Sequence, residues 1–129
     1  DQLIDHAGSA AEGSKHLLFF TPWVAEESAN PEMAKAFIAE WDKRGLNKAG
    51  LTESFRGYDG IKTIAAALEK VEGEPTADKI REALWEVELP ALNGNIKFRK
   101  DGEGDKASAQ YDANTYLVEI KDGEVVMVQ

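Results

Sequence analysis

No cysteine occurs among the 129 residues of the chain. Disulfide bonds, zinc thiolate sites and thiol catalysis are therefore excluded. The absence leaves the compartment open, because exported bacterial proteins often lack cysteine too. The chain starts at Asp1 without an initiator methionine and without a signal peptide. We therefore expect a processed protein or a piece of a longer one.

Basic residues are scarce. The 15 Lys and Arg residues stand against 24 Asp and Glu residues, so the formal net charge is −9 and the pI is about 4.7. This excess of negative charge repels a phosphate backbone, and no basic stripe with interleaved aromatic residues offsets it. Nucleic acid is therefore not an expected partner.

Long apolar runs are also missing. The longest lies around HLLFF at residues 16–20, which is far shorter than the roughly 18–20 residues that a membrane span needs. Apolar residues still make up 43% of the chain, which is enough for a packed core, and the length fits one ordinary domain. We therefore expect a folded domain rather than a disordered chain.

Three helices are predicted after residue 30. Asn30-Pro31 is a favoured pair at a helix start, and Gly45 is typical of a helix end. A second helix lies within residues 54–70, and a third follows the capping residue Thr76 and stops before Pro90. The second and third helices each carry apolar residues at helical spacing. These are Ile61, Ile64, Ala65 and Leu68 in the second, and Ile80, Ala83, Leu84 and Val87 in the third.

Strands are predicted on both sides of these helices. KHLLFF at residues 15–20 is typical of a short buried strand, and NIKF at residues 95–98 is a second short strand. TYLVEI at residues 115–120 alternates in polarity, with Tyr116, Val118 and Ile120 on one face. Asp122-Gly123 predicts a two-residue hairpin turn into the last strand. The predicted order is strand, three helices, strands.

Catalytic patterns are weak. His6 and His16 lie in or beside loop sequence rich in small residues, where a histidine is more often a surface residue than a base. No serine has the surroundings of a nucleophile elbow. An enzyme is therefore not expected, and no catalytic residue or cofactor is assigned.

Residues 101–112 partly match a calcium-binding loop. Carboxylates occupy positions 1, 3, 5 and 12 of the pattern; they are Asp101, Glu103, Asp105 and Asp112. However, Lys106 stands where the pattern needs glycine, and the last carboxylate is not the bidentate glutamate. The neighbouring segments are also predicted strands, whereas helices flank such loops. A solvated connection is the preferred interpretation, and no metal site is expected.

Several stretches occur in the order seen at the C-terminal end of type I periplasmic binding proteins. The most specific are the Y-D-G helix start at 58–60, the D-K-I-R-E-A-L helix at 78–84, the G-x-I-x-F-x-x-D-G turn at 94–102 and the K-D-G hairpin at 121–123. The chain resembles this family over nearly its whole length. More narrowly, it resembles the branched-chain amino-acid (Leu/Ile/Val) binding proteins of ABC importers.

The resemblance implies a fold of two α/β lobes joined by three crossings, with a small ligand held between them. Residues 1–129 would then be one segment, the C-terminal part of such a ligand-binding domain. The implied function is that of a periplasmic or extracellular solute-binding protein. It would close about a hinge on an amino acid or related solute and dock on an ABC permease in the membrane. A ligand-sensing regulatory domain of the same fold is the alternative.

The resemblance also places one pocket position inside the chain. Family members often have a pocket-lining residue just before the Y-D-A helix, which corresponds to Glu53. Branched-chain binders commonly carry an aromatic residue there, so the glutamate departs from their pattern. Glu53 and Phe55 are therefore the predicted ligand-binding residues at the rim of the cleft. A carboxylate enclosed there would favour a ligand group that is cationic or donates hydrogen bonds.

The resemblance further implies that Gly57 and Gly60 allow close packing of their helix on a sheet. Tyr58, by contrast, is expected to fill the core. In a two-lobe protein the apolar faces of the three helices would need another surface. We therefore expect either a piece of a longer protein or a chain that self-associates.

Overall fold

The computed structural model describes residues 2–47, 50–103 and 108–128. The helices are α1 (Gln2–Ala7), α2 (Pro31–Lys43), α3 (Leu51–Leu68) and α4 (Ala77–Leu84), with the short 3-10 segments η1 (Gly8–Ala11) and η2 (Pro22–Glu27). The strands are β1 (Lys15–Leu18), β2 (Glu88–Ala91), β3 (Gly94–Lys97), β4 (Arg99–Asp101), β5 (Ser108–Gln110), β6 (Tyr116–Lys121) and β7 (Glu124–Met127).

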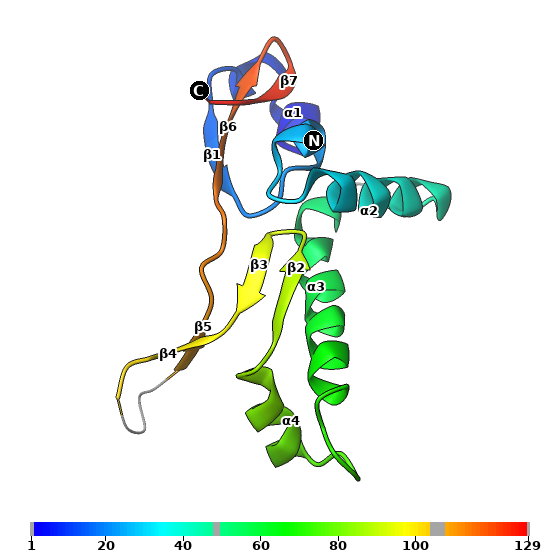
Figure 1. The fold of residues 1–129 in the computed structure, drawn as a ribbon. Coiled ribbons are helices and arrows are strands. Elements are labelled where there is room, and N and C mark those ends of the chain that lie inside the picture. The colour runs from blue at the N-terminus through cyan, green and yellow to red at the C-terminus, as the bar shows by residue number, and fades with distance from the viewer. Residues whose placement is uncertain (1, 48–49, 104–107, 129) are drawn as a thin grey trace.

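The strands form three small antiparallel sheets. Their orders are β1-β6-β7, β2-β3 and β4-β5. Figure 1 shows an elongated molecule with two ends. We call α1, η1 and the sheet β1-β6-β7 the sheet end, and α3, α4 and the hairpin β2-β3 the helix end. The helix α2 projects sideways from the junction between the two ends. Residues 111–115 lead from β5 back to β6, and we call them the return connection.

The predicted bounds of α2 and the predicted start of α4 are confirmed, whereas α4 ends at Leu84, before the predicted stop at Pro90. The helix α2 begins at Pro31, and Gly45 just beyond its end adopts a φ of +62°. The helix α4 begins after Thr76, whose side chain accepts a hydrogen bond from the backbone N–H of Lys79. Asn30 precedes α2 as predicted, but its side chain does not cap the helix. It donates instead to a distant turn that is described below.

The face that α3 buries is not the one that carries its apolar stripe. The buried residues recur at every fourth position and are Leu51, Phe55, Asp59, Thr63 and Ala67. The predicted face is the open one, because Ile61 is 70% exposed, Ile64 47% and Leu68 41%. Apolar spacing therefore identified the helix, and the described chain does not cover its apolar face. We call Ile61, Ile64 and Leu68 the open face of α3.

Two small apolar clusters hold the described chain together. The junction core comprises Phe20, Ala25, Ala34, Phe55 and Leu92, with Met33, Phe37 and Ile38 packed against it. The second cluster lies between α3, α4 and the start of β2 and comprises Ala67, Ala83 and Val87, flanked by Ile80 and Leu84 among others. The apolar face predicted for α4 is thereby confirmed.

The strand predictions hold in part. Tyr116, Val118 and Ile120 are all buried on one face of β6, as alternation predicts. Asp122 and Gly123 both have positive φ, which a two-residue hairpin turn of this kind requires. The prediction of a buried strand at 15–20 is wrong in one respect: β1 exists, but Leu17 is 63% exposed. The strand β2 was not predicted, because it contains Pro90; a proline is tolerated there because β2 pairs on one side alone.

Candidate functional site

The two predicted ligand-binding residues lie in the first turns of α3 but point to different environments. The side chain of Glu53 is 66% exposed. Phe55 is only 3% exposed and belongs to the junction core, where its ring centroid lies 5.7 Å from that of Phe20. Phe55 therefore does not stand at an open rim in this structure. A ligand-binding role for either residue remains a prediction.

Arg56 lies between the charge of Glu53 and two aromatic rings. Its Nε donates to Glu53 Oε2 at 2.6 Å. Its guanidinium carbon lies 5.1 Å from the ring centroid of Phe19 and 5.4 Å from that of Phe55. Both distances are within the range of cation–π attraction. The cation is therefore held in place at the junction while it stays accessible, with 55% of its side chain exposed.

Tyr111 brings the return connection to the same region. Its ring packs edge-on against Phe98, with centroids 6.2 Å apart. Burial raises the pKa of the Tyr111 hydroxyl, the negative charge of Asp59 raises it further, and the nearby Arg56 lowers it. The hydroxyl therefore stays protonated at neutral pH and can donate a hydrogen bond.

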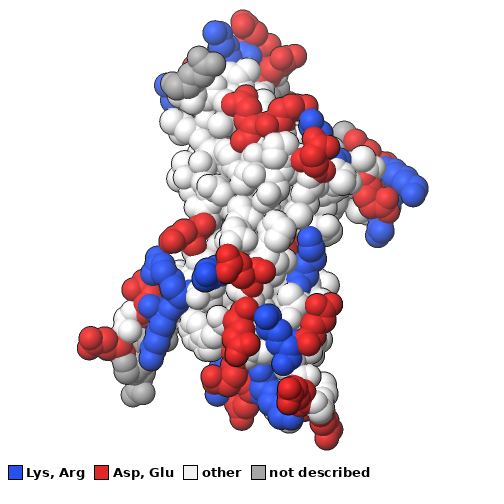
Figure 2. Space-filling view, viewed as in Figure 1, with Lys and Arg blue, Asp and Glu red and all other residues white. Residues whose placement is uncertain are grey.

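These contacts define a junction site made of Phe19, Glu53 and Arg56, and we add Tyr111 because the charge of Arg56 acts on its hydroxyl. Phe19 follows β1, Glu53 and Arg56 belong to α3, and Tyr111 lies in the return connection. The site thus combines a carboxylate, a guanidinium, an apolar ring and a phenol hydroxyl from three separate segments. Figure 2 shows that charged side chains gather toward the two ends on the face in view, while the middle is largely uncharged.

Tyr58 and the neighbouring glycines differ from their predicted roles. Tyr58 is 40% exposed and is not a core residue, although its ring lies 5.2 Å from that of Phe37. A Cβ built on Gly57 or Gly60 would meet no atom of the described chain within 4 Å. These glycines therefore do not mediate close packing within the described residues.

A separate pocket lies between α2 and α3, with a volume of about 380 Å³. Its walls are mainly aromatic and aliphatic, and they include Phe37, Trp41, Tyr58 and Leu46. The buried indole N–H of Trp41 has no hydrogen-bond partner among the described residues. None of the residues of the junction site lines this pocket.

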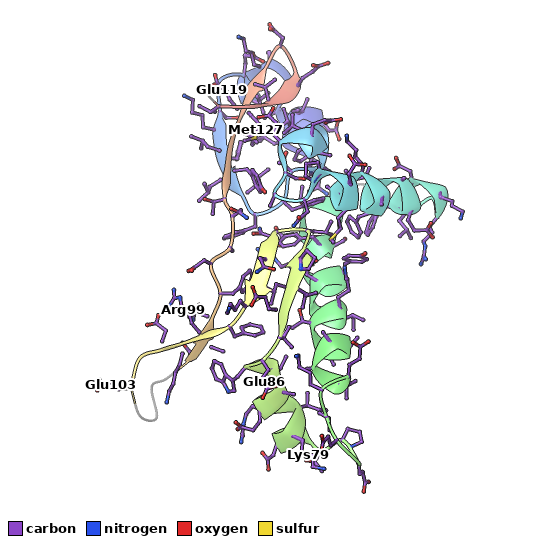
Figure 3. All side chains as sticks on the ribbon, viewed as in Figure 1. Lys79, Glu86, Arg99, Glu103, Glu119 and Met127 are labelled. Atoms are coloured by element: carbon purple, nitrogen blue, oxygen red, sulfur yellow. The ribbon has the colours of Figure 1, made fainter. Side chains whose placement is uncertain are left out.

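The calcium-loop pattern does not form a cation site in the described part of the chain. The strands β4 and β5 flank it and pair with each other. Arg99 forms ion pairs with Asp101 at 3.7 Å and Asp112 at 3.2 Å, so it neutralises two of the carboxylates. Figure 3 shows Glu103 separated from Arg99, toward the far end of this pair. Asp105 and Lys106 lie outside the described residues, and the remainder contains no group of three His, Cys, Asp or Glu that could hold a metal.

Comparison with known proteins identifies the family. A family model described as "Periplasmic binding protein" matches residues 1–124. The chain belongs to the periplasmic binding protein family. No curated protein and no solved structure matches it. The resemblance found in the sequence is thereby confirmed for the family; the branched-chain specificity remains a prediction.

Membership indicates what this periplasmic binding protein does in general terms. The family has a solute-binding role, implies a small-molecule ligand and typically consists of binding proteins without enzymatic activity. The mixed helices and sheets are consistent with part of such a fold. Within the described residues, no helix has both the length and the apolar character needed to cross a membrane.

Three members of the junction site were missed in the sequence. Arg56 stands directly after Phe55, and its position as a basic residue between two aromatics is the one local signal that could have identified it. Phe19 and Tyr111 are separated from it by 37 and 55 positions. Nothing local marks them, because their proximity to α3 depends on how the chain folds back through the return connection.

Proposed function

We propose that this periplasmic binding protein is the C-terminal part of an extracytoplasmic receptor that delivers an amino acid or related organic solute to an ABC permease. The family match over residues 1–124 is the observation that carries this proposal. The receptor works by hinge closure in the periplasm or at the cell surface. Contacts that exist only in the closed form shift the open–closed equilibrium when the solute binds.

The junction site has the chemistry to recognise an amino acid. A free amino acid carries one ammonium and one carboxylate group. Arg56 can hold a carboxylate through two parallel hydrogen bonds, and Glu53 offers the opposite charge to an ammonium group. The present ion pair between Glu53 and Arg56 is exposed and therefore weak, so a zwitterionic ligand can replace each half of it.

We also propose that further polypeptide covers the open face of α3. Contiguous apolar surface on a folded chain usually marks a contact surface. Ile61, Ile64 and Leu68 are spaced to form one such stripe along a helix of 18 residues. In this proposal the rest of the ligand-binding domain packs there, and a second copy of the chain is the other way to cover the stripe.

A thermal-shift screen tests the receptor function. The protein expressed from its complete reading frame is heated with leucine, isoleucine, valine, glutamate or arginine, each as a separate probe. A ligand at 100 times its Kd stabilises the folded state by about 2.7 kcal/mol, so binding raises the Tm. Stabilisation by at least one of these solutes is expected. If none of them, nor a broader set of small organic solutes, raises the Tm, the proposal is wrong.

A matched pair of substitutions tests the site. Arg56→Ala should weaken binding of the stabilising solute about tenfold or more, because it removes a charge-assisted hydrogen bond. Arg81→Ala is the control, since Arg81 is a similarly exposed arginine in a comparable i,i+3 ion pair with Asp78. Equal affinities of the two variants by isothermal titration calorimetry would exclude Arg56 from the site without contradicting the receptor function.

A further inference from the structure

The turn between β2 and β3 is unusual because it is buried. We call Ala91, Leu92, Asn93 and Gly94 the junction turn. Leu92 is 0% exposed and Asn93 is 1% exposed. Turns generally lie at the surface, where water satisfies their backbone groups. A buried turn must find those partners within the protein, and each partner here comes from a different segment.

Asp59 attaches the junction turn to α3. Its carboxylate is almost fully buried and accepts hydrogen bonds from the backbone N–H of Leu92 at 2.9 Å and of Asn93 at 3.3 Å. Neither N–H belongs to the ladder between β2 and β3, because the register pairs Ala91 with Gly94 across the turn. The side chain of one helical residue therefore satisfies two otherwise unpaired donors.

Asn93 attaches the same turn to the sheet end. Its Nδ2 donates to the carbonyl oxygen of Phe19, just after β1, and to that of Asn114 at 3.1 Å. Its Oδ1 accepts from the backbone N–H of Asn114 at 2.6 Å. Asn114 belongs to the return connection. One buried side chain thus binds both segments that continue into the paired strands β1 and β6.

Two further contacts fix the position of the turn. Asn30, ahead of α2, donates to the carbonyl oxygens of Ala91 at 2.6 Å and Gly94 at 3.0 Å. Gly94 has a φ of +103°, and a Cβ at this position would collide with the side-chain amide of Asn114. Glycine is therefore favoured by the backbone conformation, and any Cβ here would also displace the side-chain amide of Asn114.

We propose that Asp59 and Asn93 are positioning residues that set the angle between the sheet end and the helix end. Apolar contacts in the small junction core are non-directional, whereas hydrogen bonds weaken steeply when their angles change. Among the described residues, the hydrogen bonds of Asn93 are directional contacts that join the two ends directly. They fix where Phe19 and Tyr111 stand relative to Arg56. The inference rests on the proposed function at this point, because the angle between the two ends would govern closure on a solute.

Distance measurements between spin labels, made without any ligand, test whether Asp59 and Asn93 set the angle between the two ends. We call these two residues the clamp. In the protein made from the complete reading frame, Lys121 on β6 and Glu82 on α4 are replaced by cysteine and labelled; both are exposed, and none of the 129 residues is a competing cysteine. Asn93→Ala removes the bonds to Phe19 and Asn114 and should broaden the distance distribution about twofold. Asn95→Ala is the control, because Asn95 lies in the same hairpin but its side chain donates to exposed Glu88.

The outcomes separate the clamp from the receptor function. Broadening in Asn93→Ala with an unchanged distribution in Asn95→Ala supports the inference, and a wild-type width in Asn93→Ala overturns it. If Asn93→Ala does not fold, Asn93→Asp decides in the same way, because it keeps the shape of the side chain but cannot donate to the carbonyl oxygens of Phe19 and Asn114. If the distance distribution broadens in Asn93→Ala but the protein binds no solute, the inference about Asn93 holds and the proposed function fails. If the protein binds a solute but the distribution of Asn93→Ala does not broaden, the inference fails and the proposed function holds.

Discussion

Replacing Ile61 by alanine tests whether the open face of α3 is covered in the complete protein. Ile61 is 70% exposed in the described chain, more than Ile64 or Leu68. Full burial of an isoleucine side chain contributes about 1.5–3 kcal/mol. Because less than a third of Ile61 is shielded, the contacts described here account for less than about 1 kcal/mol of that amount.

A covered face predicts a larger loss. Truncating a fully buried isoleucine to alanine costs about 2–5 kcal/mol, since the lost transfer free energy is increased by the cavity left behind. Ile61→Ala in the protein from the complete reading frame should therefore lower the free energy of unfolding by about 2–5 kcal/mol. The losses in unfolding free energy expected for a covered and for an uncovered Ile61 differ by more than the error of a careful denaturation experiment.

Urea denaturation followed by circular dichroism measures this loss, and light scattering on the same samples reports the oligomeric state. Glu69→Ala serves as the control, because Glu69 is an exposed residue just after α3 and its substitution should change stability by less than about 0.5 kcal/mol. A loss of about 2–5 kcal/mol in a monomer favours cover by the same chain, and in a dimer cover by a second copy. A loss below about 1 kcal/mol in a monomer would refute the reasoning.

Two further predictions concern the junction. Leu92→Ala should cost about 2–5 kcal/mol by urea denaturation, because Leu92 is fully buried in the junction core; a loss below about 1 kcal/mol would contradict that packing. Burial raises the pKa of Asp59 above its ordinary value of 3.8, against the two backbone N–H bonds and Lys62, which lower it. The folded chain then holds this proton more tightly than the unfolded chain, so the contribution of Asp59 is greatest below pH 3.8 and falls as pH rises through the raised pKa. Relative to Asp59→Asn, the wild type should lose stability as the pH is raised from 4 toward neutrality, and a difference independent of pH would contradict this sign.

Local rules predicted the elements whose ends are set by local chemistry. The proline that begins α2, the glycine just after it and the capping Thr76 each act on the backbone within one turn. The Asp122-Gly123 turn likewise follows from the positive φ that its two residues tolerate. Such features depend on a few neighbouring residues, so a single sequence contains all the information they need.

The contacts that build the junction depend on distant partners and were not predictable in the same way. Asn30 has the residue type and position of a helix cap, yet its side-chain amide donates hydrogen bonds to the carbonyl oxygens of Ala91 and Gly94, 61 and 64 positions away. Asp59 lies 33 positions from the turn that it binds. A residue type that serves locally in most proteins can serve a long-range contact equally well, and only the fold decides which partner it finds.

The two faces of α3 differ in character, because the described chain buries one that contains polar residues and leaves the apolar stripe open. The face buried by the described chain includes Asp59 and Thr63, and burying a carboxylate is costly unless its oxygens are satisfied. A helix with one buried face would be expected to bury its isoleucines and expose its aspartate. The reverse is seen here, because the aspartate has two specific donors in the junction turn. An arrangement that buries the polar face and leaves the apolar one open is stable at low cost if a second apolar surface covers the isoleucines, as expected for a helix packed on both sides.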